Sequence, residues 1–122
     1  MITEVNPFPA LERLLDLLHR RVKAGASADE FNLIMRTIEL INERRPIFKD
    51  DEQYVYYIGA DEPSRAPYRV TISSCTCPRG NERTCKHRLL VAALEGKTLH
   101  TEGFEYTRRK KVVKQEETLQ LA

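Results

Sequence analysis

Residues 75–87 read CTCPRGNERTCKH, and this stretch decides how the C-terminal half of the chain is expected to fold. It contains all three cysteines of the chain, and a histidine follows the last cysteine two residues later. Three thiolates and one imidazole in two close pairs form a donor set that Zn²⁺ prefers in a tetrahedral site. The predicted ligands of a single zinc ion are Cys75, Cys77, Cys85 and His87.

The predicted zinc is structural, because four protein ligands leave no position for an activated water. Buried, unliganded cysteines would be the bland alternative, but they do not explain the paired spacing. A disulfide between Cys75 and Cys77 would be strained, and an odd cysteine count argues against a disulfide framework. His19 lies among charged neighbours and His100 lacks a nearby partner, so neither is expected to be a ligand.

The spacing of the second ligand pair places it at the start of a helix. Residues two apart on an α-helix point about 200° apart, so both ligands cannot lie inside one. Cys85 is therefore expected to precede a helix, with His87 in its first turn. Its apolar residues are Leu89, Leu90, Ala93 and Leu94, and Gly96 marks its end.

Two strands are predicted before the first ligand pair. Residues 54–58 (YVYYI) are rich in aromatic and branched side chains, and residues 68–73 alternate apolar with polar. They should pair as a hairpin. Asp50, Asp51 and Glu52 precede them and are expected to form a solvated cap rather than a metal site. A further strand could involve Phe104, Tyr106, Val112 and Val113.

The N-terminal part predicts an antiparallel pair of helices. The first has its apolar stripe at Leu11, Leu14, Leu15, Leu18 and Val22, with Gly25 just past its end. Ser27 and Glu30 have the spacing of a capping box that opens the second. That helix has its stripe at Phe31, Ile34, Met35, Ile38 and Ile41, and the Arg45-Pro46 pair stops it.

The predicted fold is therefore α+β, with a helical hairpin in residues 1–48, a ββα zinc finger in residues 49–99 and a basic extension in residues 100–122. The hairpin would either pack on the finger or pair with a second copy as a homodimer. The 41% hydrophobic and 31% charged content fits a globular chain rather than a disordered one.

The pattern Cys-x-Cys, seven residues, Cys-x-His resembles the SWIM-type zinc finger, CxCx(n)CxH. Pro78 after Cys77, the preceding strand pair and the apolar helix after His87 fit the resemblance, which covers about residues 54–97. It implies a ββα fold around the metal. Domains of this family occur in chromatin remodellers, transposases, recombination mediators and signalling proteins, so it also implies DNA binding or protein contacts.

Positive charge concentrates at and after the predicted metal loop. Residues 79–114 hold ten Lys and Arg against four Asp and Glu, whereas the whole chain has a net charge of only +2. Such a concentration can neutralise phosphates, although a short basic run can equally be a solvated surface. The candidate nucleic-acid contacts are Arg79, Arg83, Lys86, Arg88, Arg108, Arg109, Lys110 and Lys111.

These observations predict a small zinc protein that binds nucleic acid, with DNA favoured. The alternative is an adaptor that docks on a larger nucleic-acid-processing enzyme. No paired carboxylates, phosphate loop or Ser/His/Asp arrangement is recognisable, so no enzymatic activity is expected. No apolar stretch reaches the roughly 20 residues of a membrane span, and the first ten residues lack the pattern of a secretory signal. The expected location is intracellular: the cytoplasm, or the nucleus in a eukaryote.

Overall fold

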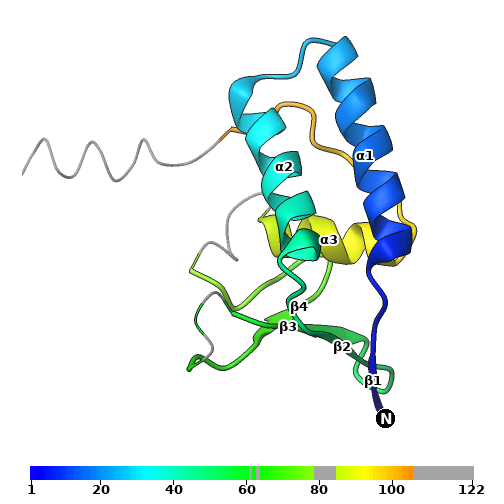
Figure 1. Ribbon diagram of the computed structural model, residues 1–122, viewed down its shortest axis with the longest axis vertical. Coiled ribbons are helices and arrows are strands. Elements are labelled where there is room, and N and C mark those ends of the chain that lie inside the picture. The colour runs from blue at the N-terminus through cyan, green and yellow to red at the C-terminus, as the bar shows by residue number, and fades with distance from the viewer. Residues whose placement is uncertain (61, 63, 79–84, 106–122) are drawn as a thin grey trace, which may run out of the picture.

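The computed structural model describes residues 1–60, 62, 64–78 and 85–105. Within these residues the element order is β1 (Ile2–Glu4), α1 (Phe8–Lys23), α2 (Ala28–Asn42), β2 (Ile47–Asp50), β3 (Val55–Ile58), β4 (Tyr68–Val70) and α3 (Lys86–Leu94). The α+β class predicted from the sequence is confirmed. Figure 1 shows α1 and α2 side by side, α3 crossing beneath them, and the sheet on the far side of α3.

Local chemistry explains the turn between α1 and α2 and the start of α2, but α2 ends earlier than predicted. Gly25 has φ of 86°, and this left-handed conformation lets the chain turn after α1. Ser27 is the N-cap of α2 and its side chain accepts the Glu30 N–H at 3.2 Å. The α2 helix ends at Asn42, three residues before the expected stop, and Arg44 follows with φ of 55°.

The buried faces of the two helices differ from the predicted stripes. On α1 the buried residues are Ala10, Leu14 and Leu17, whereas Leu15 is 48% exposed and Val22 is 53% exposed. On α2 the predicted Phe31 is 39% exposed. The prediction was wrong at these three positions, because both helices carry more apolar residues than one face can bury and tertiary packing selects the buried face. The further buried apolar residues of α2 are Leu33 and Leu40.

The sheet is antiparallel throughout, in the order β1-β2-β3-β4. The predicted hairpin of β3 and β4 is present, with Tyr56 opposite Val70. Both strands are shorter than predicted, since Tyr54 has φ of 56° in the preceding turn and Ile72 lies in the turn after β4. The sequence analysis missed β1 and β2, which pair Ile2 with Asp50 across the sheet edge.

Asp50 ends β2 and is 9% exposed rather than solvated. Its Oδ1 accepts the N–H groups of Glu52 at 3.0 Å and Gln53 at 3.3 Å. It therefore caps the turn between β2 and β3, as a short aspartate side chain commonly does.

One apolar core joins the described elements other than β1, whose three residues are exposed. Leu14, Leu17 and Ile34 of the hairpin, Ile58 and Val70 of the sheet, and Leu90 of α3 belong to the same buried cluster. The hairpin thus packs on α3 within the chain. The Arg13 Nη1 donates to the Ala93 carbonyl at 2.6 Å, which adds a polar contact between α1 and α3.

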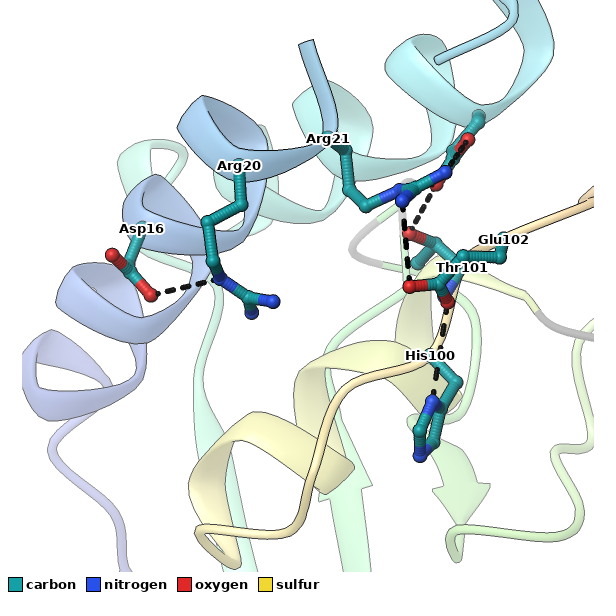
Figure 2. Close-up of polar contacts among 7 residues, drawn as sticks. Asp16, Arg20, Arg21, His100, Thr101 and Glu102 are labelled. Atoms are coloured by element: carbon teal, nitrogen blue, oxygen red, sulfur yellow. Dashed lines mark hydrogen bonds and ion pairs between the residues drawn. The ribbon is translucent and has the colours of Figure 1, made fainter. Parts of the chain in front are cut away.

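The chain after α3 returns to the helical hairpin and is held there by a partly buried polar network (Figure 2). Arg21 donates to both carboxylate oxygens of Glu30, at 2.5 and 3.3 Å, and Glu30 is only 2% exposed. The Thr101 hydroxyl donates to Glu30 at 2.8 Å, and Arg21 lies 3.5 Å from Glu102. Glu30 therefore does not complete the capping box but joins three parts of the chain.

Figure 1 draws residues 106–122 in grey, so the further strand expected to include Tyr106, Val112 and Val113 lies outside the described residues. Phe104 is described and does not lie in a strand. Among the described residues, no helix has both the length and the apolar character needed to cross a bilayer.

Candidate metal centre

The first two candidate ligands are positioned by a tight turn after β4. The Thr71 Oγ1 accepts the N–H groups of Ser73 at 3.2 Å and Ser74 at 3.0 Å, which reverses the chain. Cys75 then lies opposite Val70 in an isolated antiparallel bridge. The sequence analysis did not single out Thr71, although a Thr-Ile-Ser-Ser run is a signal for such a hydroxyl-capped turn.

After the turn that follows β4, the chain runs back along this strand, and hydrogen bonds to Arg69 hold Thr76, the residue between Cys75 and Cys77. Thr76 donates its N–H to the Arg69 carbonyl at 3.1 Å, and its hydroxyl accepts the Arg69 N–H at 2.9 Å. The Cys77 N–H points to the Cys75 Sγ at 3.4 Å. These bonds hold Cys75 and Cys77 on a rigid turn rather than on a free loop.

The second pair occupies the start of α3, as the spacing predicted. Cys85 is the N-cap of this helix, and His87 is its second residue. The Cys85 Sγ accepts the Arg88 N–H at 3.4 Å, in the position where Ser or Asp usually caps a helix. The positive end of the helix therefore faces this sulfur and favours its thiolate form.

The four side chains meet in one buried cluster. One ligand atom from each of Cys75, Cys77, Cys85 and His87 lies within 4.8 Å of all the others, and the Cys85 Sγ is 4.0 Å from the His87 Nδ1. In a tetrahedral sulfur and nitrogen site the donor atoms lie about 3.5–4 Å apart. The cluster is therefore close to the size needed for one metal ion.

The burial of the four side chains also indicates that they could hold one metal ion. Cys75, Cys85 and His87 are 7%, 6% and 3% exposed, and Cys77 is half-buried. Within the described part of the chain, the His87 Nε2 is buried without a hydrogen-bond partner. Leaving a buried polar atom without a hydrogen bond lowers the stability of a fold by about 1–3 kcal/mol. Apolar packing alone does not explain why an imidazole occupies this position. A cation coordinated through Nε2 would supply the missing partner, with Nδ1 left facing the Cys85 Sγ.

The surroundings shift the pKa values of the Cys75 and Cys85 thiols in opposite directions. A hydrogen bond from Cys75 lowers the pKa of Cys85 to about 4, against the effect of burial and with further help from His87 and the Arg88 N–H. The same hydrogen bond and burial raise the pKa of Cys75. Of the two thiols, Cys85 is therefore the one that loses its proton more readily.

Tyr68 is a further residue of the site that the sequence analysis placed only in a strand. Its ring lies against the His87 ring with centroids 4.8 Å apart and planes tilted by 55°. Tyr68 belongs to β4, so the sheet contributes a ring contact to the imidazole. The alternating pattern of residues 68–73 predicted Tyr68 on the apolar side of a half-buried strand but did not predict its contact with His87.

The structure brings together the four predicted ligands and leaves the other two histidines apart from them. His19 is exposed on α1, and the exposed His100 lies 3.9 Å from Glu102. Cys75, Cys77, Cys85 and His87 could thus hold one metal ion.

Of the predicted nucleic-acid contacts, Lys86 and Arg88 are described and both are half-buried. The Arg88 Nε donates to the Ile72 carbonyl at 2.9 Å and so ties α3 to the turn that carries the first cysteines. The remaining candidates lie outside the described residues: Arg79, Arg83, Arg108, Arg109, Lys110 and Lys111. Arg69 on β4 is exposed beside the cysteine turn and was not among the candidates.

Comparisons of the chain with protein-family models, with curated proteins and with solved structures gave no match in any of the three.

Proposed function

We propose that Cys75, Cys77, Cys85 and His87 hold one structural Zn²⁺, and that the folded finger binds nucleic acid, DNA in particular, through the basic surface around it. The observation that carries the proposal is the buried three-cysteine, one-histidine cluster. Three thiolates and an imidazole suit Zn²⁺ better than Mg²⁺ or Ca²⁺, which prefer oxygen ligands.

The zinc in this proposal has no catalytic role. Four protein ligands close a tetrahedral shell, and such sites stabilise folding rather than activate water. The ion would hold the turn after β4 against the start of α3, two parts of the chain that otherwise meet through few residues. The proposed role is therefore binding without catalysis.

Charge supports the nucleic-acid part of the proposal. Three thiolates and Zn²⁺ leave a formal charge of −1, which the nearby Lys86 and Arg88 offset. The basic residues beyond these, from Arg79 to Lys114, exceed what that single charge requires. Phosphate neutralisation by such an excess gives affinity that falls steeply with salt. The resemblance of the ligand spacing to SWIM-type fingers points the same way.

The test is a titration of the full zinc-loaded chain against a labelled DNA duplex at about 50 and about 200 mM salt. We expect binding that weakens with salt. The Arg108→Gln/Arg109→Gln variant should lower the slope of log affinity against log salt by about one for each phosphate that it no longer neutralises. The charge-matched control is Arg36→Gln/Arg44→Gln, two residues remote in sequence from the basic segment.

The control should keep the slope of the unsubstituted chain. Absence of binding at the lower salt concentration, by a chain shown to be folded and to contain zinc, would contradict the nucleic-acid role and favour docking on a protein partner. A single-stranded RNA of equal length in the same titration distinguishes DNA from RNA.

A further inference from the structure

The three cysteines of the candidate metal centre differ in how deeply they are buried. Cys75 and Cys85 are 7% and 6% exposed, whereas Cys77 is half-buried and is the least buried of the three. Oxidation of a cysteine depends on its thiolate character and on how far solvent reaches it. Cys77 is therefore the sulfur that a dissolved oxidant such as hydrogen peroxide reaches first.

Two other sulfurs lie close enough to react with an oxidised Cys77. All donor atoms of the cluster lie within 4.8 Å of one another, so a disulfide of about 2.0 Å needs two sulfurs to approach by less than about 3 Å. Cys75 lies only two residues away on the turn that is bonded to Arg69, and a bond between Cys75 and Cys77 would strain that turn. Cys85 comes from a separate element, the start of α3. The geometry therefore favours a bond between Cys77 and Cys85.

Such a bond would also remove the N-cap of α3. The Cys85 Sγ accepts the Arg88 N–H at 3.4 Å, and a disulfide sulfur has no negative charge with which to accept it or to face the positive end of the helix. The same first turn carries the Arg88 Nε, which donates to the Ile72 carbonyl at 2.9 Å. Losing the cap therefore loosens the connection between α3 and the turn that carries Cys75 and Cys77.

We propose that the metal centre is a reversible thiol switch, in which hydrogen peroxide joins Cys77 to Cys85 by a disulfide bond, releases the metal ion and uncaps α3. The switch rests on the zinc site proposed above and is independent of nucleic-acid binding. After oxidation only Cys75 and His87 remain as donors, and two donors do not close a tetrahedral shell. A dithiol that reduces the disulfide restores the full donor set.

The chemistry of the switch balances in two steps. In the first step, the Cys77 thiolate attacks one oxygen of hydrogen peroxide; the S–O bond forms, the O–O bond breaks, and the departing hydroxide takes up a proton to give water. In the second, the Cys85 thiolate attacks the Cys77 sulfur; the S–S bond forms, the S–O bond breaks, and a second hydroxide leaves and is protonated. Peroxide accepts the two electrons that the sulfurs lose, and the metal ion keeps its charge.

The test treats the purified, zinc-loaded full chain with a small molar excess of hydrogen peroxide and follows zinc release with a zinc-sensitive dye. We expect release to be faster than in the untreated chain by about tenfold or more, and dithiothreitol with added Zn²⁺ should restore the bound ion. Amide hydrogen exchange should accelerate at the start of α3, with α2 of the same chain as the internal control. The oxidised chain should have lost two hydrogen atoms and gained no oxygen by mass spectrometry.

Peptide mapping of the oxidised chain identifies the bonded pair. After alkylation of the remaining thiol, the alkyl group should lie on Cys75, and the peptide that contains Cys77 should be joined to the one that contains Cys85. Cys75→Ser and Cys77→Ser are matched variants, since each removes one ligand. Under peroxide Cys75→Ser should still form the disulfide, whereas Cys77→Ser should form one more slowly by about tenfold or more.

Failure of the switch is distinguishable from failure of the zinc site. A zinc-loaded chain that keeps its ion under peroxide, or that gains oxygen without forming a disulfide, overturns the switch and leaves the zinc site in place. A disulfide that includes Cys75 overturns it as well. A chain purified without any zinc contradicts the metal site itself, and the switch with it.

Discussion

At the scale of single residues, Cys85 and Tyr68 each make an unusual contact at the candidate metal cluster of Cys75, Cys77, Cys85 and His87. Cys85 caps α3 and belongs to the cluster at once, so the same sulfur fixes the start of the helix and faces the other donors. Tyr68 supports the His87 ring from the sheet. The sequence predicted where Cys85 and His87 lie relative to the helix, because two residues in a first turn obey local geometry. It could not predict Tyr68, since contact with His87 depends on how β4 meets α3.

Tyr56 gives a prediction at this scale that is independent of metal. Burial, together with the negative charge of Glu95 and a hydrogen bond to it, raises the pKa of Tyr56 to about 12 from an ordinary value of 10.0. The folded chain therefore holds the phenol proton more tightly than the unfolded chain. The resulting stability is present below pH 10 and is lost as the pH rises from about 10 to about 12.

The measurement is the free energy of unfolding in urea across this alkaline range. Tyr56→Phe should flatten the decline, because the group that ionises on unfolding has been removed. Tyr54→Phe is the matched control, since Tyr54 is 77% exposed in the turn before the same strand. A decline of equal steepness in Tyr56→Phe and in the unsubstituted chain would show that other groups cause it.

At the scale of elements, features set by neighbouring residues were predictable from the sequence, whereas pairings between distant segments were not. Gly25 and Ser27 act on neighbouring residues, so the turn between α1 and α2 was predictable. The pairing of β1 with β2 brings together segments more than 40 residues apart, and each strand is too short to show a periodic pattern. Two apolar stripes overlap on α1, and only packing against α3 and α2 shows which one is buried. The prediction therefore included Leu15 and Val22 in the wrong face.

Substitution of Thr101 tests how strongly the segment after α3 is held to the helical hairpin. Its hydroxyl donates to Glu30 at 2.8 Å, and both residues are 2% exposed. Thr101→Val keeps the shape but leaves the buried carboxylate with one donor fewer, which should lower the free energy of unfolding by about 1–3 kcal/mol.

Thr98→Val is the matched control, because Thr98 is exposed three residues earlier in the same segment. Its effect should stay within about 0.5 kcal/mol, the usual range for surface substitutions. Urea denaturation of the two variants beside the unsubstituted chain gives the comparison. Equal stabilities for the two variants would mean that the Thr101–Glu30 bond does not hold this segment.

At the scale of the whole molecule, the cluster of Cys75, Cys77, Cys85 and His87 is continuous with the apolar core, because Cys75 and Cys85 belong to both. The core joins the hairpin, the sheet and α3, while the cluster joins the turn after β4 to the start of α3. A chain of 122 residues can build only a modest core, and a metal commonly supplements one of this size. With Zn²⁺ bound as proposed, its removal should loosen β4 and α3 against each other before it affects the helical hairpin.

The most direct test of the central claim is the metal content of the purified full chain, determined by elemental analysis. We expect about one zinc per chain, and loss of that zinc in Cys85→Ser together with a lower melting temperature. His19→Gln, which alters an exposed histidine outside the cluster, should retain the metal. A chain that is folded without any bound metal, or a Cys85→Ser variant with full zinc content and unchanged stability, would contradict the assignment.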